Sequence, residues 1–253
     1  MNRGQKVLIV GGVAGGASAA ARLRRLDESA RIIMFERGEY ISFANCGLPY
    51  YIGGIIRDKS SLTLQTPASF KARFNVDVRI NNEVVAINPK NKTVRVKDLV
   101  TGAEYEENYD KLILSMGAEP VKPNIEGINS DKVFVLRNIP DTYKIKEYID
   151  DFKPKSAVVV GGGFIGVEMA ENLRHLGLEV SVIEAQNQVM APLDYEMALP
   201  VHARLREAGI RLYLGDGVDS FEDRDKAVSV KLRSGTEVRA DLVILSIGVR
   251  PNG

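Results

Sequence analysis

The chain contains two copies of one pattern: a short β-branched strand, a glycine turn and a helix rich in small residues. Residues 6–21, KVLIVGGVAGGASAAA, resemble residues 156–171, SAVVVGGGFIGVEMAE, which lie 150 positions further along. A second pair of similar segments is offset by 131 positions, with YDKLILSMGAEP beginning at Tyr109 and ADLVILSIGVRP at Ala240. Internal similarity of this kind predicts two units of one design.

Each copy continues with a second strand that ends in an acidic residue, and alternating segments follow. A strand, a glycine turn, a helix and a second strand form the βαβ unit of a doubly wound parallel sheet, and the alternating segments predict an antiparallel meander. The expected strands are residues 7–10, 32–36, 83–87, 93–97, 158–160, 180–184, 227–232 and 237–240, and the expected helices include residues 141–150 and 195–207. The fold class is therefore α/β, with two Rossmann-like units that each combine a parallel sheet with an antiparallel β-meander.

Composition excludes several classes of function. Lys and Arg number 34 and Asp and Glu 33, a balance that gives no reason to expect nucleic acid or a membrane surface as a partner. One Cys excludes a disulfide framework and a zinc site of several thiolates. The two histidines, His175 and His202, lack metal-ligand spacing and are expected to be structural, so no metal site is expected. No apolar stretch reaches the roughly 18 residues of a transmembrane helix.

The first residues imitate a secretory signal peptide, because the segment from Asn2 to Lys6 precedes an apolar run and a cluster of alanines. Four glycines interrupt the run, and a basic amphipathic segment follows at residues 22–26. A strand, a turn and a helix explain these residues better. We therefore expect a cytoplasmic protein.

The second glycine turn carries a full GxGxxG pattern at Gly161, Gly163 and Gly166. The first glycine permits a tight turn, the second lets a pyrophosphate approach the backbone, and the third lets helix and strand pack closely. Glu184 ends the next strand about 20 residues on, where an acid binds ribose hydroxyls. A purely structural glycine turn is the alternative.

The first glycine turn departs from that pattern. Gly11, Val13 and Gly16 occupy the three positions, so the middle residue is valine, although Gly15 keeps the backbone open. Glu36 closes the second strand of this copy. Taken with the second turn, this one predicts a protein that binds two dinucleotides.

The lone cysteine, Cys46, lies on a glycine-proline loop that follows the first acidic strand end. Asn45 or Cys46 is expected to cap a helix whose first turn contains Pro49. A thiol at a helix N-terminus is biased towards the reactive thiolate. The alternative is a buried structural cysteine, the usual state of a lone Cys.

These motifs together resemble the flavin-dependent pyridine nucleotide–disulfide oxidoreductases, in the single-cysteine branch that holds coenzyme A-disulfide reductases, NADH oxidases, NADH peroxidases and persulfide reductases. The string SFANCGLPYYIGG, residues 42–54, is most similar to coenzyme A-disulfide reductases. The resemblance covers the whole chain and implies FAD and NADH as cofactors, with NADPH as an alternative. It implies that hydride passes from the nicotinamide to the flavin, which then reduces a sulfur bound to Cys46. One Cys must work through a mixed disulfide, a persulfide or a sulfenic acid.

The resemblance also assigns roles to individual residues. Cys46 is implied as catalytic; Gly11, Val13, Ala14, Gly15, Gly16, Glu36, Arg37, Gly117, Gly161, Gly163, Phe164, Ile165, Gly166, Glu184 and Gly248 as cofactor-binding; and Arg22, Arg25, Ser42, Asn45, Lys71 and Arg73 as coenzyme A-binding. Arg22 and Arg25 share a helix face, which a solvated surface explains equally well. Phe164 stands where relatives carry an aromatic residue that covers the flavin, and a plain hydrophobic turn residue is almost as good an explanation.

The resemblance further implies the domain organisation. Residues 1–117 form the first half of an FAD-binding domain, residues 118–247 an inserted NAD(P)H-binding domain, and residues 248–253 a return to the first. Relatives continue past this point with the rest of the flavin domain and a dimerisation domain. We therefore expect a homodimeric parent, and we expect this chain alone to bind FAD weakly and to be inactive.

Three functions remain open. The leading hypothesis is reduction of coenzyme A disulfide, or of a coenzyme A persulfide or polysulfide, by NADH through FAD. The second is an oxidase or peroxidase that uses a Cys46 sulfenic acid. The third is a non-catalytic dinucleotide-binding or redox-sensing module.

Overall fold

The computed structural model describes residues 4–253, so Asn2 and Arg3 of the signal-peptide-like start lie outside the described residues. Contacts divide the chain into two compact units. Unit 1 comprises the described residues through Ala44, Ser60–Gly117 and Pro251–Gly253, and unit 2 comprises Asn45–Lys59 and Ala118–Arg250. Unit 2 thus interrupts unit 1, as a domain inserted in another would. Among residues 4–253, no helix is both long and apolar enough to cross a membrane.

Unit 1 is built on a parallel sheet in the order β3-β2-β1-β7, with an antiparallel meander β4-β5-β6. Its strands are β1 (Lys6–Val10), β2 (Arg31–Glu36), β3 (Asp77–Ile80), β4 (Asn82–Asn88), β5 (Thr93–Asp98), β6 (Glu104–Asn108) and β7 (Lys111–Leu114). Its helices are α1 (Ala14–Leu26) and α3 (Pro67–Phe74), and the 3-10 turn η2 (Lys59–Leu62) lies at its boundary.

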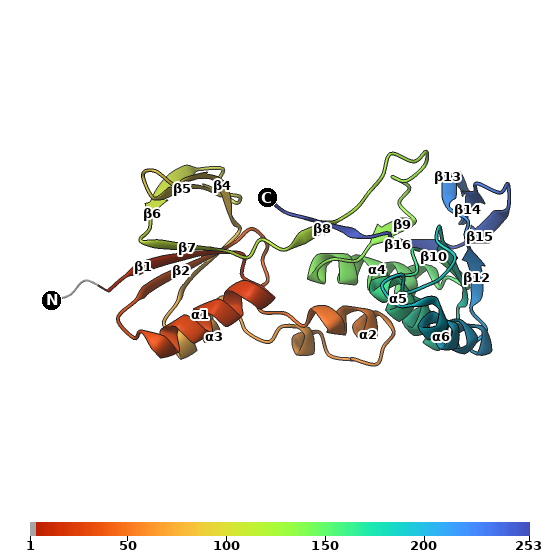
Figure 1. Cartoon of the computed structure of the whole chain (residues 1–253), viewed down its shortest axis with the longest axis horizontal. Helices are drawn as coiled ribbons and strands as arrows, with labels where there is room; N and C mark the ends of the chain where they lie inside the picture. The colour runs from red at the N-terminus through yellow and green to blue at the C-terminus, as the bar shows by residue number, and fades with distance from the viewer. Residues whose placement is uncertain (1–3) are drawn as a thin grey trace. The chain divides into compact units, whose positions relative to one another are not determined.

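Alternation along β1 explains how this sheet is covered. Val7 and Ile9 pack on one side in a cluster that includes Phe70 of α3, whereas Leu8 packs on the other side with Val94 of the meander. Helices α1 and α3 therefore cover one face of the sheet and β4–β6 the other, as Figure 1 shows. A strand buried on both faces is typical of parallel sheets.

Unit 2 repeats this plan with a parallel sheet in the order β12-β11-β10-β16-β9 and a meander β13-β14-β15. Its strands are β8 (Ala118–Pro120), β9 (Val133–Val135), β10 (Ser156–Val160), β11 (Glu179–Glu184), β12 (Arg211–Leu214), β13 (Val218–Arg224), β14 (Ala227–Leu232), β15 (Glu237–Ala240), β16 (Leu242–Leu245) and β17 (Val249–Pro251). Its helices are α2 (Leu48–Ile52), α4 (Ile139–Phe152), α5 (Phe164–His175) and α6 (Tyr195–Glu207), preceded by the 3-10 turn η1 (Asn45–Gly47).

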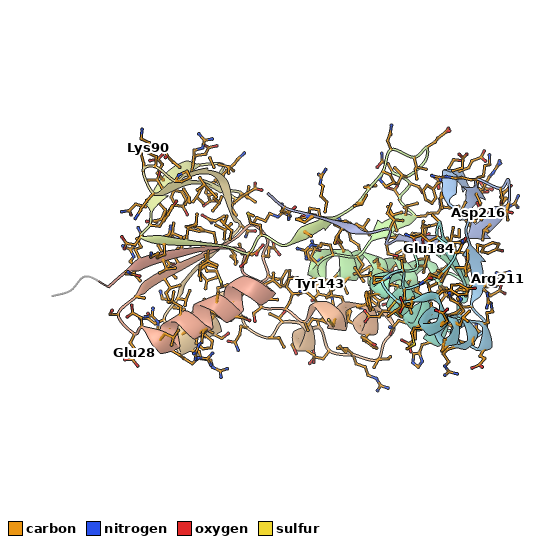
Figure 2. All side chains as sticks on the ribbon, viewed as in Figure 1. Glu28, Lys90, Tyr143, Glu184, Arg211 and Asp216 are labelled. Atoms are coloured by element: carbon orange, nitrogen blue, oxygen red, sulfur yellow. The ribbon has the colours of Figure 1, made fainter. Side chains whose placement is uncertain are left out.

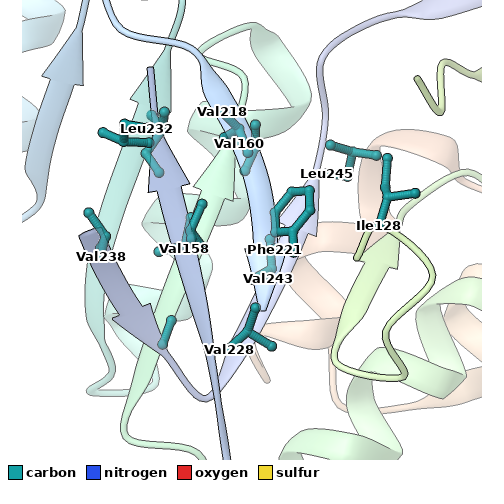
Figure 3. Close-up of a cluster of buried hydrophobic side chains, with 13 residues drawn as sticks. Ile128, Val158, Val160, Val218, Phe221, Val228, Leu232, Val238, Val243 and Leu245 are labelled. Carbon is teal, nitrogen blue, oxygen red and sulfur yellow. The ribbon is translucent and has the colours of Figure 1, made fainter. Parts of the chain in front are cut away.

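The core of unit 2 joins its sheet to its meander. Val158 and Val243 of the sheet are buried against Phe221 and Val228 of the meander (Figure 3). The same alternation as in β1 leaves Val159, also fully buried, for the opposite face. All the strands and both helices expected from the sequence are therefore present, which confirms the α/β fold with two similar units.

The repeated aspartates hold equivalent strands in both units. Asp110 accepts a hydrogen bond from the Lys6 backbone N–H at 2.7 Å. Asp241, its counterpart, accepts from Lys155 N–H at 2.7 Å and from Ser156 N–H at 2.9 Å. In each unit the carboxylate just before β7 or β16 thus holds the start of the neighbouring strand, β1 or β10.

Two element ends differ from expectation. Helix α4 begins at Ile139, because Asn138 caps it and exchanges hydrogen bonds with Asp141 in a capping box. Helix α2 is capped by Gly47 with no side-chain hydrogen bond, so the prediction that Asn45 or Cys46 caps it is wrong. Asn45 and Cys46 instead belong to the 3-10 turn η1, which directly precedes α2 and so moves the cap to the end of this turn.

The compact units also differ from the predicted domain bounds at two places. Residues 45–59 belong with unit 2, because α2 packs against α4 and α5. The return to unit 1 begins at Pro251, three residues later than expected. Whether these units act as flavin and nicotinamide domains remains a prediction.

Candidate functional site

The glycine turn of unit 2 is as tight as the GxGxxG pattern requires. Gly161 has φ +104°, and a side chain there would overlap the Ser246 carbonyl oxygen. A side chain on Gly166 would overlap the Gly161 carbonyl oxygen. At Gly163, by contrast, no atom lies within 4 Å of the position of a Cβ, so the backbone is open at the start of α5. Open backbone at a helix N-terminus is where a dinucleotide pyrophosphate binds.

The turn of unit 1 has the same geometry in spite of Val13. Gly11 has φ +97° and faces the Ser115 carbonyl oxygen, and Gly16 faces the Gly11 carbonyl oxygen, so neither leaves room for a side chain. Val13 stands at the N-cap of α1, where it is half-buried, and Ala14 and Gly15 behind it are exposed. The valine therefore takes the middle position without closing the helix start.

Each acidic strand end binds its own glycine turn. Glu36 accepts hydrogen bonds from the backbone N–H groups of Gly12 and Gly38, both at 2.8 Å. Glu184, labelled in Figure 2, accepts from Gly162 at 2.6 Å and Gln186 at 2.9 Å. Each carboxylate oxygen can accept a further hydrogen bond, so both groups are held in place with acceptors left for ribose hydroxyls.

In both units a residue with left-handed backbone binds the glycine turn through its N–H, a repeated feature that was not predicted from the sequence. Ser42 has φ +44° and donates its N–H to the Gly12 carbonyl at 2.9 Å. Met190 has φ +54° and donates to the Gly162 carbonyl at 2.7 Å. A left-handed backbone at a residue other than glycine is uncommon and marks a local constraint. Because Ser and Met share no chemistry, only the backbone shows the equivalence.

His202 supports the loop behind the unit 2 turn. It is 2% exposed, and its Nε2 accepts the Val189 backbone N–H at 3.1 Å, so the ring must be neutral there. Val189 in turn packs against Gly162. Burial lowers the pKa of His202 below its usual 6.5, and Arg206 adds to the effect. The prediction that His202 is structural agrees with this position, beside a nucleotide turn.

Because of this histidine, we expect the free energy of unfolding to decrease as the pH is lowered. Because the folded state favours neutral His202, its contribution is full above pH 6.5 and is lost as the pH falls below that value. Urea denaturation at pH 7.5 and 5.5 should show a drop of roughly 1 kcal/mol that His202→Gln removes. His175→Gln, at an exposed histidine of the same unit, is the control and should keep the drop. An unchanged drop in His202→Gln would contradict this role.

Unit 1 contains a cavity of about 410 Å³ beside its glycine turn. Glu36 and Arg37 line one side, residues 82–87 of β4 another, and Met116 a third. This volume lies within the range of ligand pockets, and an acid at the end of the second strand suits the ribose of an adenosine. Strand β4 was expected only as part of a meander, because its role depends on the strand's place beside Glu36.

The predicted coenzyme A-binding cations lie on two adjoining helices of unit 1. Arg22 and Arg25 are exposed on α1, and Lys71 and Arg73 are exposed on α3. Their neighbour Arg24 points elsewhere. Its guanidinium donates to the carbonyls of Phe74, Asn75 and Glu28 and so joins the C-terminal ends of α1 and α3. The structure thus places the two pairs of exposed cations on neighbouring helices of one unit.

The cysteine segment belongs to unit 2. Cys46 and Asn45 are exposed, so the alternative of a buried structural cysteine is wrong. Helix α2 behind them is buried at Leu48, Pro49, Tyr51 and Ile52, and Gly53 at its end lies against Asn172 of α5, where no side chain fits. The exposed thiol thus lies in the turn η1, directly before a short helix that packs on the helix of the unit 2 glycine turn.

Aromatic contacts continue this packing. The rings of Tyr51 and of Tyr143 from α4 lie edge to face, with their centres 6.0 Å apart. The Lys59 ammonium lies 4.4 Å from the centre of the Tyr143 ring. Phe164 and Ile165 open α5, and Phe164 is 60% exposed. The structure has other exposed large hydrophobic side chains, such as Phe152, so the covering role of Phe164 stays a prediction.

The matching glycines near the ends of the two sheets also adopt left-handed backbone. Gly117 has φ +69° and accepts the Asn252 N–H at 3.0 Å within unit 1. Gly248 has φ +133° and accepts the Val121 N–H at 2.9 Å within unit 2. Neither contact shows a cofactor role, which stays a prediction for both residues.

The fold and these turns define a protein with two dinucleotide-binding units and one exposed cysteine. A family model for the pyridine nucleotide-disulphide oxidoreductases matches residues 5–253. The chain therefore belongs to that family, whose members are oxidoreductases that use FAD and NAD(P)H.

Individual relatives narrow the likeness. A coenzyme A disulfide reductase of Staphylococcus haemolyticus is 39% identical over 98% of this chain and 55% of its own length. The solved structure of Bacillus anthracis CoADR-RHD in its reduced form is 54% identical, with a TM-score of 0.94 over 98% of this chain and 44% of that one. The structure of an NAD-dependent persulfide reductase from A. fulgidus is 39% identical, with a TM-score of 0.92 over 98% of this chain and 46% of that one. The structure of a water-forming NADH oxidase from Lactobacillus brevis is 35% identical, with a TM-score of 0.90 over 98% of this chain and 54% of that one. The chain spans about half the length of these relatives.

Proposed function

We propose that the protein reduces coenzyme A disulfide, or a coenzyme A persulfide or polysulfide, with electrons from NAD(P)H. The observation that carries this proposal is the exposed thiol of Cys46 in the turn η1. This turn leads directly into α2, which packs against α5, the helix of a dinucleotide turn. The names of the relatives, coenzyme A disulfide reductase and persulfide reductase, support the same class of substrate.

Cys46 would carry the substrate sulfur. Its thiolate attacks one sulfur of coenzyme A disulfide, a mixed disulfide forms, and one coenzyme A leaves as a thiolate. Two electrons then break the mixed disulfide, release the second coenzyme A and restore Cys46 as a thiolate. These 253 residues hold no second cysteine that could displace the bound thiol. We therefore assign the electron pair to a cofactor.

The residues of the two units suit that cofactor pair. FAD, when bound, accepts a hydride from the nicotinamide and supplies the electron pair to the sulfur. We assign the unit 1 turn, Glu36 and the 410 Å³ cavity to the adenosine end of FAD, and the unit 2 turn with Glu184 to NAD(P)H. Phe164 would then shield the flavin when the nicotinamide is absent.

Unit 1 would bind the phosphates of coenzyme A. Arg22, Arg25, Lys71 and Arg73 offer four exposed cations on α1 and α3, and phosphates bind such groups strongly. Ser42 and Asn45 flank the pantetheine end in this proposal. We further propose a cytoplasmic homodimer with no nucleic acid or membrane partner, and flavin and nicotinamide domains that follow the predicted bounds.

The likeness to a water-forming NADH oxidase favours one alternative, in which Cys46 forms a sulfenic acid and oxygen or peroxide is reduced. The full-length protein, reconstituted with FAD, distinguishes the two. NADH oxidation should be fastest with coenzyme A disulfide or polysulfide and much slower with peroxide or air. Faster turnover with oxygen or peroxide would favour the oxidase.

We expect NADH to be the better nucleotide. The 2′-phosphate of NADPH would meet the like charge of Glu184, and the next residues, Ala185 to Asn187, include no Lys or Arg. Stopped-flow reduction of the flavin should give a kcat/KM about tenfold higher for NADH, or ~1.4 kcal/mol. Glu184→Gln should narrow this ratio. Equal or faster reduction by NADPH in the native protein would contradict the role of Glu184.

A further inference from the structure

An arginine from a distant hairpin reaches the loop that follows Glu184. Arg233 stands at the turn between β14 and β15, and its backbone N–H donates to the Gly217 carbonyl at 2.9 Å. A Cβ placed on Gly217 would lie 3.3 Å from Cζ and Nε of Arg233 and 3.6 Å from the Cβ of Ala185. The guanidinium and the Ala185 methyl therefore flank one open position, and glycine at 217 keeps it open.

The guanidinium of Arg233 has no ion pair or side-chain hydrogen bond among residues 4–253, although the side chain is exposed on a meander rich in acids. Three other cations of this meander are paired. Arg224 and Lys231 both bind Glu222 at 3.0 Å, and Arg239 binds Glu237 at 3.2 Å. An unpaired arginine held beside a nucleotide turn is available to a ligand.

The position of this guanidinium fits the adenosine end of a nucleotide. Glu184 ends β11 with its carboxylate held by two backbone N–H groups, and Ala185 follows it directly. In such units the acid binds the 2′-hydroxyl, and a cation beside it accommodates a 2′-phosphate. Sequence proximity offered no cation here, but the fold brings one from 48 residues away.

Acidic groups around the same position limit what this cation can do. The backbone N–H of Asp216 donates to the Glu184 carbonyl at 3.2 Å, and the Asp216 carboxylate accepts the Ser234 N–H at 3.2 Å. Figure 2 shows Glu184 and Asp216 labelled in the same part of unit 2. With two carboxylates and one guanidinium, the local charge stays negative. We therefore expect the site to tolerate the 2′-phosphate of NADPH but not to prefer NADPH over NADH.

We propose that Arg233 forms a subsite for the 2′-phosphate of NADPH and that this subsite makes the protein accept both nicotinamide nucleotides. The inference rests on the proposed assignment of unit 2 to NAD(P)H. A guanidinium binds phosphate oxygens through paired, charge-assisted hydrogen bonds, so it offsets much of the repulsion from Glu184.

The test compares Arg233→Gln with Arg239→Gln in the full-length protein reconstituted with FAD. Arg239 is the matched control, because it lies on the next strand and is paired with Glu237. Two readouts are taken: calorimetric affinity for adenosine 2′,5′-bisphosphate against AMP, and flavin reduction by NADPH against NADH.

We expect Arg233→Gln to lower the affinity for adenosine 2′,5′-bisphosphate, relative to that for AMP, by about tenfold. The ratio of flavin reduction by NADH to that by NADPH should rise by the same factor. Arg233→Lys should recover part of the loss, and Arg239→Gln should leave both ratios unchanged. Equal losses for both nucleotides, as stacking on the adenine would give, would overturn the 2′-phosphate subsite and leave the proposed function intact. Failure of the native protein to bind AMP or to react with either nucleotide would overturn both.

Discussion

Replacing Cys46 by Ser should lower turnover with coenzyme A disulfide by roughly a thousandfold or more, the scale on which loss of a nucleophile acts. Serine has nearly the same size and keeps the exposed turn η1 intact, so the loss isolates the chemistry of sulfur. A hydroxyl forms no mixed disulfide. The measurement is NADH oxidation by the full-length protein with saturating coenzyme A disulfide.

The same variant supplies its own control. Flavin reduction by NADH under anaerobic conditions should persist, because the thiol takes no part in nucleotide binding or in the first electron transfer. Turnover of coenzyme A disulfide at the native rate would refute the role of Cys46. Loss of flavin reduction together with turnover would show instead that the substitution had damaged the fold or a cofactor site.

Two glycines of the unit 2 turn should respond to alanine in opposite ways. Gly161→Ala places a methyl group on the Ser246 carbonyl oxygen at φ +104°, so we expect a loss of about 3 kcal/mol in the free energy of unfolding. Gly163→Ala enters open space, and at this N-cap it should cost at most about 1 kcal/mol. Thermal or urea denaturation of the two variants checks this difference.

Nucleotide affinity separates the two substitutions a second time. If a pyrophosphate approaches the open backbone, Gly163→Ala should lower the affinity for NADH by about tenfold while the protein stays stable. Calorimetric titration with NADH measures this directly. Native affinity in Gly163→Ala would show that the open backbone has another use, and equal stability of the two variants would contradict the packing described for Gly161.

The repeated glycine turns made most of the fold predictable. Gly11 and Gly161 stand at the ends of strands with the same pattern, and each must adopt a backbone that only glycine adopts easily, so sequence and geometry agree there. The aspartates Asp110 and Asp241 match for a similar reason, since both hold the start of a strand through its backbone N–H groups.

Features that depend on backbone alone, or on packing between distant segments, were not predictable. Ser42 and Met190 occupy equivalent left-handed positions, but their side chains have nothing in common. The cap of α2 was misplaced, because a 3-10 turn precedes the helix and moves the cap to Gly47. Arg233 and Ala185 lie on either side of Gly217 only because the β14–β15 hairpin folds back beside the end of β12. The sequence alone therefore understated the charge around Glu184.

The central claim is that Cys46 bears the substrate sulfur, and mass spectrometry of the Cys46 peptide tests it most directly. The full-length protein, oxidised with coenzyme A disulfide in the absence of NADH, should carry one coenzyme A on that peptide. One equivalent of NADH should then release coenzyme A and restore the free thiol. An unmodified Cys46, or one found only as a sulfenic acid while coenzyme A disulfide is still turned over, would contradict the account.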